Sequence, residues 1–208
     1  MKGLFYKEAR CLWQYGKSYA LLVVIFFGLA FLNNGDAGVN PLWLLYPVFF
    51  VGSLPASLLS ADEKDGWLVY CETLPVTRRQ LVTAKYVTSA ALTVVIIALV
   101  LLAALVSGQF AQPRASFLAA ILPLLPVAGL GVPALMFPAI FKLGATKGRT
   151  VYIATVMIAA ATCAVLMVSE EVKDALMALS PLPMIAAALV VFAASWLLSV
   201  KWFEAREL

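Results

Sequence analysis

The chain is divided by six long stretches that contain no charged residue. They are Ser18–Gly35, Ala37–Ala61, Tyr86–Pro113, Ala115–Phe141, Thr150–Ser169 and Ala175–Val200. Each is long enough for a helix that crosses the hydrocarbon core of a bilayer, which takes about 18 residues or more. A chain inside a membrane must satisfy its own backbone hydrogen bonds, so such stretches form helices. We therefore expect an all-α, polytopic membrane protein with six transmembrane helices.

The composition agrees with this fold class. The chain is 63% hydrophobic and 12% charged, with a mean hydropathy of +0.97. Soluble domains carry about 25% charged residues. Because six spans use nearly the whole length, residues 1–208 are expected to form a single transmembrane domain, with accessory segments at residues 1–17 and 60–76.

The basic residues indicate the orientation of the chain. Thirteen of the 15 fall in the N-terminal segment, the 60–86 loop, the loop after the fourth span and the C-terminus, and only Arg114 and Lys173 fall between these groups. Cytoplasmic segments of membrane proteins are enriched in Lys and Arg. We expect both termini in the cytosol of a bacterium, at its inner membrane. The net charge of +4 reflects this asymmetry and does not indicate nucleic-acid binding.

The N-terminal residues 2–17 are predicted to form an amphipathic helix on the membrane surface. Phe5, Leu12 and Trp13 share one arc of a helical wheel, opposite Lys7 and Arg10. A basic face beside an aromatic one suits anionic headgroups, so membrane lipid is an expected partner. An extended, positively charged segment is the alternative.

A polar loop between Ser60 and Tyr86 separates the second and third spans. Ser60 and Glu63 have the spacing of a helix N-terminal capping box, and Thr77 and Gln80 form a second one. Pro75 interrupts the helix between them. We expect a short helix, a turn and then a long helix. The alternative is a plain solvated connector.

The fourth span is rich in helix-breaking residues. Prolines and glycines recur at Pro123, Pro126, Gly129, Gly131, Pro133 and Pro138. Freed backbone groups at membrane depth persist only where protein or a cavity satisfies them. This span is therefore predicted to be kinked or broken and packed inside the bundle.

Several kinds of chemistry are excluded by the sequence. With no histidine, catalytic triads and HExxH metal sites cannot form, and no phosphate-binding GxxxxGK[ST] loop is present. No catalytic residue and no metal or cofactor site is expected. The predicted spans also lack the charges that mark ion or proton pathways. Any energy from ATP must then come from another chain.

The polar loops resemble those of a known family. The run from Glu72 to Arg79, ending at Lys85-Tyr86, resembles the cytosolic loop of type-2 ABC transporter permeases, also called type V exporters. The acidic Asp62–Gly66 segment precedes it as in that family. Phe141–Gly144 followed by Lys147–Arg149 looks like the second cytosolic loop of its small six-span members. The resemblance covers essentially the whole chain, although the segment between the last two spans is shorter than in many relatives.

The resemblance implies the membrane-spanning permease subunit of an ATP-driven ABC exporter. Such permeases pair, here as a homodimer by preference or with a sister permease, and each docks a cytosolic P-loop ATPase subunit that binds ATP and Mg²⁺. Small members export antimicrobial or amphipathic peptides or confer resistance to them, so peptides or drugs are the expected substrates. A membrane scaffold or regulator and a secondary carrier are the alternatives.

The loop after the second span would then provide a coupling helix that sits in a groove of the ATPase. The residues expected at this interface are Asp62, Glu63, Asp65, Gly66, Trp67, Leu68, Glu72, Leu74 and Pro75. Trp67 could instead dip into the membrane interface, where tryptophan is also favoured.

The topology makes a direct prediction. Reporter fusions after Lys64 and after Lys173 should report opposite sides of the membrane, because basic residues flank the first site and are sparse around the second. Fusions that report the same side would contradict the six-span arrangement.

Overall fold

The computed structural model describes residues 2–32, 42–106, 123–166 and 181–206. Within these ranges the chain is helical and contains no strand, so the all-α fold class is confirmed. The helices are α1 (Lys2–Leu32), α2 (Leu42–Lys64), α3 (Trp67–Cys71), α4 (Arg78–Val106), α6 (Leu124–Leu166) and α8 (Pro181–Glu204).

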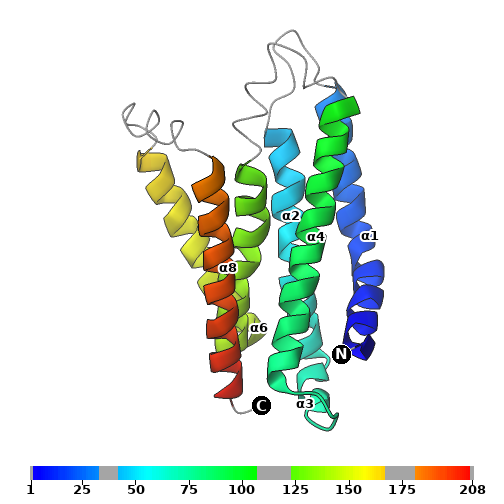
Figure 1. Cartoon of the computed structure of the whole chain (residues 1–208), viewed down its shortest axis with the longest axis vertical. Helices are drawn as coiled ribbons and strands as arrows, with labels where there is room; N and C mark the ends of the chain where they lie inside the picture. The colour runs from blue at the N-terminus through cyan, green and yellow to red at the C-terminus, as the bar shows by residue number, and fades with distance from the viewer. Residues whose placement is uncertain (1, 33–41, 107–122, 167–180, 207–208) are drawn as a thin grey trace.

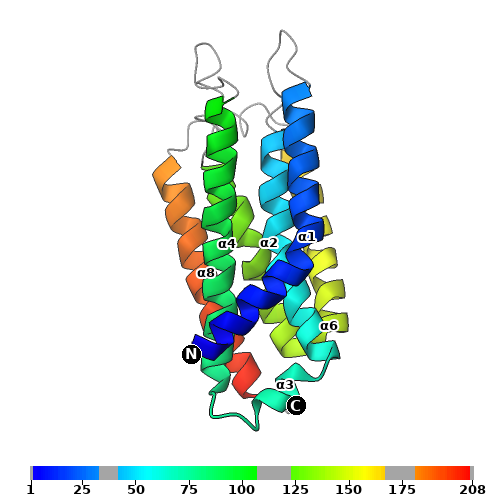
Figure 2. The same ribbon diagram turned by 90° about the vertical axis from the view of Figure 1, so that its right-hand side faces the viewer.

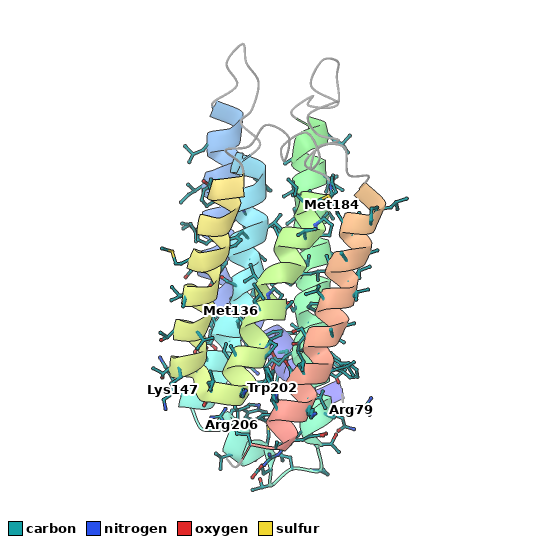
Figure 3. The ribbon with its side chains drawn as sticks, turned by 90° about the vertical axis from the view of Figure 1, so that its left-hand side faces the viewer. Arg79, Met136, Lys147, Met184, Trp202 and Arg206 are labelled. Atoms are coloured by element: carbon teal, nitrogen blue, oxygen red, sulfur yellow. The ribbon has the colours of Figure 1, made fainter. Side chains whose placement is uncertain are left out.

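The long helices form an elongated bundle, with both ends of the chain at the same end of the molecule (Figure 1). The short helix α3 lies at that end too. The most extensive contacts join α6 to α2 and to α8, and α1 packs on α2 and α4 (Figure 2). The segments that the sequence predicts to be cytosolic therefore come together. We call this the basic end; Arg79, Lys147 and Arg206 lie there, and Met184 lies at the opposite end (Figure 3).

Four described helices are long and apolar enough to cross a membrane. They are Gly3–Leu29, Arg78–Ala103, Leu124–Gly148 and Leu182–Glu204. These helices identify the chain as a membrane protein. The total of six spans stays a prediction. The predicted turn around Asn33–Asp36 lies outside the described residues, as does most of Ser169–Pro183.

Helix α6 reverses direction at Gly144. The backbone there has φ 83° and ψ 169°, and the segments before and after it run antiparallel (Figure 1). A positive φ favours glycine, which has no Cβ to clash. The loop expected after the fourth span is thus a turn at one residue, Gly144. Pro133 and Pro138 lie within helical backbone, so the described part of the fourth span is not broken at these prolines. The non-helical residue, Gly144, lies after the end of that span.

The burial predicted for the fourth span is confirmed. In its apolar stretch 56% of the residues are buried, compared with between 6% and 33% in the other three candidate spans. Glycine permits the closest contact: the Gly129 backbone packs against Thr93 of α4, whose Oγ1 donates a hydrogen bond to the Gly129 carbonyl at 3.2 Å.

Two predictions about helix ends have different outcomes. The second capping box is confirmed: the Thr77 amide donates to Gln80 Oε1 and the Gln80 amide to Thr77 Oγ1, both at 3.2 Å. The first is wrong, because α2 continues through Ser60 to Lys64 and Ser60 Oγ donates to the Ala56 carbonyl within that helix. The separate short helix begins only at Trp67, so the predicted coupling helix is shorter than expected.

The N-terminal segment is helical as predicted but is not a separate helix. It forms the first part of α1, inclined to the remainder (Figure 2). Leu4 and Glu8 are buried, whereas Trp13 is 78% exposed. The face that packs on the bundle is therefore not the predicted aromatic arc. Contact of that arc with lipid stays a prediction.

An aromatic core fills the bundle near the basic end. Tyr86 packs against Phe137 and Phe192, with ring centroids 4.8 and 5.1 Å apart, and Phe141 packs against Phe203 at 5.0 Å. The Tyr86 hydroxyl is hydrogen-bonded to Ser195 and Ser199 of α8. The core thus joins α4, α6 and α8.

Glycine substitutions in α6 test this packing. A Cβ at Gly129 would lie 2.4 Å from Thr93 Cγ2, whereas one at Gly131 would meet no atom within 4 Å. We expect Gly129→Ala to lower the free energy of unfolding by about 1–3 kcal/mol. Gly131→Ala should be neutral or stabilising because alanine favours helix.

Thermal unfolding in detergent would measure both variants. Thr93→Ser removes the clashing methyl group, so it should restore part of the stability when combined with Gly129→Ala. Equal melting temperatures for the two alanine variants would contradict the proposed close contact.

Candidate functional site

Four charged side chains from three helices form a buried cluster at the basic end. Lys7 and Glu8 come from α1, Asp62 from α2 and Lys85 from α4. Lys85 is 2% exposed, Glu8 3% and Asp62 7%. We call these four residues the charge cluster.

Positive and negative groups alternate within the charge cluster. Asp62 accepts from both ammonium groups, one on each carboxylate oxygen. Glu8 Oε1 lies 2.7 Å from Lys85 Nζ and 3.4 Å from Lys7 Nζ. The formal charges cancel. Burying charges costs several kcal/mol per ion, which only good mutual pairing offsets, so the cluster holds α1, α2 and α4 in one relative position.

The charge cluster corrects an expectation about the spans. The sequence predicted charge-free spans beginning at Ser18 and Tyr86, but the apolar helices that contain them begin earlier and include Glu8 and Lys85. These charges lie near the ends of the helices. Glu8 and Lys85 are paired with each other, and Lys85 is also paired with Asp62.

The short helix α3 is attached to the charge cluster through Trp67. Lys7 Nζ lies 4.8 Å from the centroid of the Trp67 ring, a cation–π contact. Gly66, with φ 71°, allows the chain to turn between α2 and α3. Leu68 and Cys71 pack into the aromatic core. One face of α3 is thus held by the bundle.

A second network ties the end of α2 to α6 and α8. Glu63 accepts from Arg206 at 2.7 Å and from the amide of Ala145 at 2.5 Å. That amide belongs to the first turn after the reversal at Gly144, where backbone donors lack partners within the helix. Glu63 therefore caps the second segment of α6.

Arg78 connects the loop after α3 to the end of α8. Its guanidinium donates to the carbonyls of Phe203 and Glu204, at 2.9 and 3.3 Å, and pairs with Glu72. Because the last carbonyls of a helix lack partners within it, a cation at that position is favourable. The loop 72–78 is consequently fixed at both ends.

The predicted interface residues separate into two groups. Asp65, Gly66, Glu72 and Pro75 are exposed. The others are partly or fully buried or are occupied by internal pairs: Asp62, Glu63, Trp67, Leu68 and Leu74. The structure thus brings these residues to one end of the molecule, and their contact with an ATPase stays a prediction.

Sequence reasoning missed three residues of this region. Glu8 lies one helical turn from Leu4 and from Leu12, so an acid on an apolar stripe was the available signal. Val69 and Tyr70 are 56% and 55% exposed, large apolar side chains on the outer face of α3. In a helix of five residues, the sequence alone does not show which face is covered.

The described residues contain no group of His, Cys, Asp or Glu side chains that could hold a metal ion. Among the cysteines, Cys11 and Cys71 are free thiols. Burial raises the pKa of the Cys71 thiol, which disfavours the reactive thiolate. The paired charges of this region are suited to mechanical connection between the helices.

A comparison with protein families decides the identity of this helical bundle. The family described as ABC-2 family transporter protein matches residues 3–204. The chain belongs to this ABC-2 family. No curated protein and no solved structure matches it.

Membership in the ABC-2 family explains why no catalytic group is required. The chain is a membrane-embedded, permease-type component, and members of this family normally work with an ATPase partner. The expected resemblance to type-2 ABC permeases is thereby confirmed. α3 and the two ionic networks therefore belong to the end of an ABC-2 permease at which its termini meet.

Loss of one cation should strongly destabilise this permease. Lys85→Met leaves Glu8 and Asp62 with Lys7 as their only cluster cation, and breaking a buried ion pair costs about 3–5 kcal/mol. Lys64→Met, at an exposed position, should cost less than about 0.5 kcal/mol. Unfolding by a denaturing detergent would give both values.

A double variant separates charge from packing. Adding Glu8→Gln to Lys85→Met removes the unpaired negative charge, so the pair should be less destabilised than Lys85→Met alone. If the two variants unfold alike, the loss is one of packing and not of charge pairing.

Proposed function

We propose that this chain is the membrane-spanning permease subunit of an ATP-driven ABC exporter in a bacterial inner membrane. The observation that carries the proposal is the placement of α3. It stands at the end where both termini lie, and the charge cluster joins it through Lys7 and Trp67 to three long helices. A force applied to α3 would therefore reach the bundle.

The outer face of α3 is the proposed docking surface for a cytosolic P-loop ATPase subunit. It consists of Val69 and Tyr70 of α3, flanked by Asp65 and Glu72, and all four are exposed. A large aromatic side chain such as Tyr70 often anchors an interface, and flanking charges set orientation and association rate. Trp67 and Leu68 contact the bundle on the inner face of α3. We therefore propose Val69 and Tyr70 as the contact residues in their place.

ATP and Mg²⁺ would bind to that partner. The partner would supply the phosphate-binding loop that this sequence lacks, and a change in its shape on hydrolysis would move α3. Because α3 is short and packed on one face, it would move together with the end of α2. A second copy of the permease completes the proposed exporter.

The substrate we propose is amphipathic or lipophilic, such as a peptide or a drug. Apart from Arg79, Lys201 and Glu204 at the basic end, the exposed large side chains of α4 and α8 are apolar. The buried cation of the charge cluster, Lys85, is already paired. Such helices offer no fixed counter-charge to a small hydrophilic ion, whereas an apolar molecule can exchange lipid contact for protein contact.

A secondary carrier is the second candidate function. Buried ionisable residues within membrane helices often mark ion or proton pathways, and Glu8 and Lys85 have this position. Each is paired with a neighbour of opposite charge, so ion binding would require the charge cluster to open. Substrate movement that needs no ATPase would distinguish this candidate from the exporter.

Truncation of the outer face of α3 tests the exporter. Val69→Ser with Tyr70→Ala should weaken binding of the ATPase subunit by about tenfold or more, because both side chains would be interface anchors. Tyr6→Ala is the matched control, since Tyr6 is also exposed, at 71%, but lies on α1. Co-purification and a binding titration are the measurements.

The reconstituted complex gives a second readout of the same variants. ATP hydrolysis stimulated by amphipathic peptides should fall in the α3 variant and persist in the Tyr6→Ala control, with unfolding unchanged in both. Full binding and stimulation in the α3 variant would show that this face does not dock the ATPase. Stimulation by sugars or inorganic ions alone would contradict the proposed substrate class.

A further inference from the structure

An open apolar groove lies between α1, α2 and α4, away from the charge cluster. Its volume is about 310 Å³. Gly16, Ala20 and Val24 of α1 form part of one wall, with Leu54 of α2 and Val95 of α4 among the others. The three helices lie side by side in Figure 2. Its size is at the lower end of the range for small-molecule sites, about 300–1,000 Å³.

The walls of the groove define its occupant as an apolar chain. Among the described side chains that line the groove, only Tyr19 carries a polar group. Its hydroxyl is hydrogen-bonded to Ser57 Oγ at 3.3 Å. An empty apolar groove would lose dispersion contacts along its lining. In a bilayer, the apolar molecule available to fill it is a lipid acyl chain.

The rim of the groove carries a cation and an interfacial aromatic residue. Trp13, Lys17 and Val24 follow one another along a single stripe of α1, at spacings of four and seven residues. Val24 lines the groove, and Trp13 and Lys17 are exposed. Lys17 has no ion pair with any described residue. Trp13 and Lys17 lie just before the charge-free stretch that begins at Ser18, and tryptophan and lysine are typical of such membrane–water boundaries.

We propose that this groove binds one acyl chain of an anionic phospholipid, with its headgroup at Lys17. The bound lipid belongs to the leaflet at the basic end. Apolar contact retains the chain, and the free ammonium group selects an anionic headgroup over a zwitterionic one. The site is independent of the docking surface on α3.

Native mass spectrometry from nanodiscs tests the site. The nanodiscs contain equal amounts of phosphatidylglycerol and phosphatidylcholine. Gly16 lines the groove and a Cβ there meets no atom within 4 Å, so Gly16→Leu places an apolar side chain in the groove. We expect this variant to lose one retained phosphatidylglycerol per chain. Gly28→Leu is the matched control, because Gly28 is equally open, lies on the same helix and does not line the groove.

Headgroup selection has its own variant. Lys17→Gln should lower the preference for phosphatidylglycerol over phosphatidylcholine by about fivefold, the effect of one lysine near an anionic surface. Ala20→Leu repeats the test of the groove if Gly16→Leu is poorly folded. Unchanged lipid retention in the filled variants would overturn the proposal. If the filled variants change the proportion of dimer and not the number of retained lipids, the proposal is also overturned, because the groove would then be a contact between two copies of the chain.

Discussion

This end of the molecule depends on the ion pairs that two consecutive carboxylates of α2, Asp62 and Glu63, form with cations from elsewhere in the chain. Successive side chains on a helix diverge by about 100°, so Asp62 and Glu63 face different neighbours. Asp62 meets the lysines of α1 and α4, and Glu63 meets Arg206 and the reversed segment of α6. Separating Lys85 from Asp62 would leave a buried charge unpaired, which is costly, and separating Arg206 from Glu63 would break a partly buried pair. The end of α2 therefore sets the relative positions of α1, α4, α6 and the chain end after α8.

This connection gives α3 its mechanical meaning within an ABC-2 permease. α3 follows α2 after two residues, and its inner face is held by the aromatic core and by Lys7. A displacement of α3 must carry the end of α2 with it or break the cation–π contact. Since α2 holds both ionic networks, such a displacement is distributed over the bundle. The groove beside α1 lies along a different face of the same helices, so lipid could influence the bundle without occupying the docking surface.

The sequence predicts the parts of this architecture that depend on local patterns. Apolar length predicts the helices, the positions of Lys and Arg predict the basic end, and the spacing of Thr77 and Gln80 predicts where α4 begins. What it does not predict depends on which helix faces meet. Ser60 and Glu63 have the spacing of a cap, but α2 already supplies backbone partners at Ser60, and Glu63 caps a helix distant in sequence. The burial of Glu8 is not predicted, because its partner Lys85 comes from α4 and the sequence does not show which helix faces meet. The outer face of α3, Val69 and Tyr70, becomes evident only once the core covers Leu68.

The reversal at Gly144 makes the two segments of α6 a single mechanical unit. A Cβ on Gly148 would lie 2.7 Å from the backbone of Ala139 and Ile140, so the two segments of α6 are in backbone contact immediately after the turn. A turn of one residue provides no slack that would allow one segment to slide along the other. The two segments therefore form one rigid hairpin, and its turn is fixed to the end of α2 where the amide of Ala145 donates to the Glu63 carboxylate. A rotation of this hairpin against α2 would have to break that hydrogen bond.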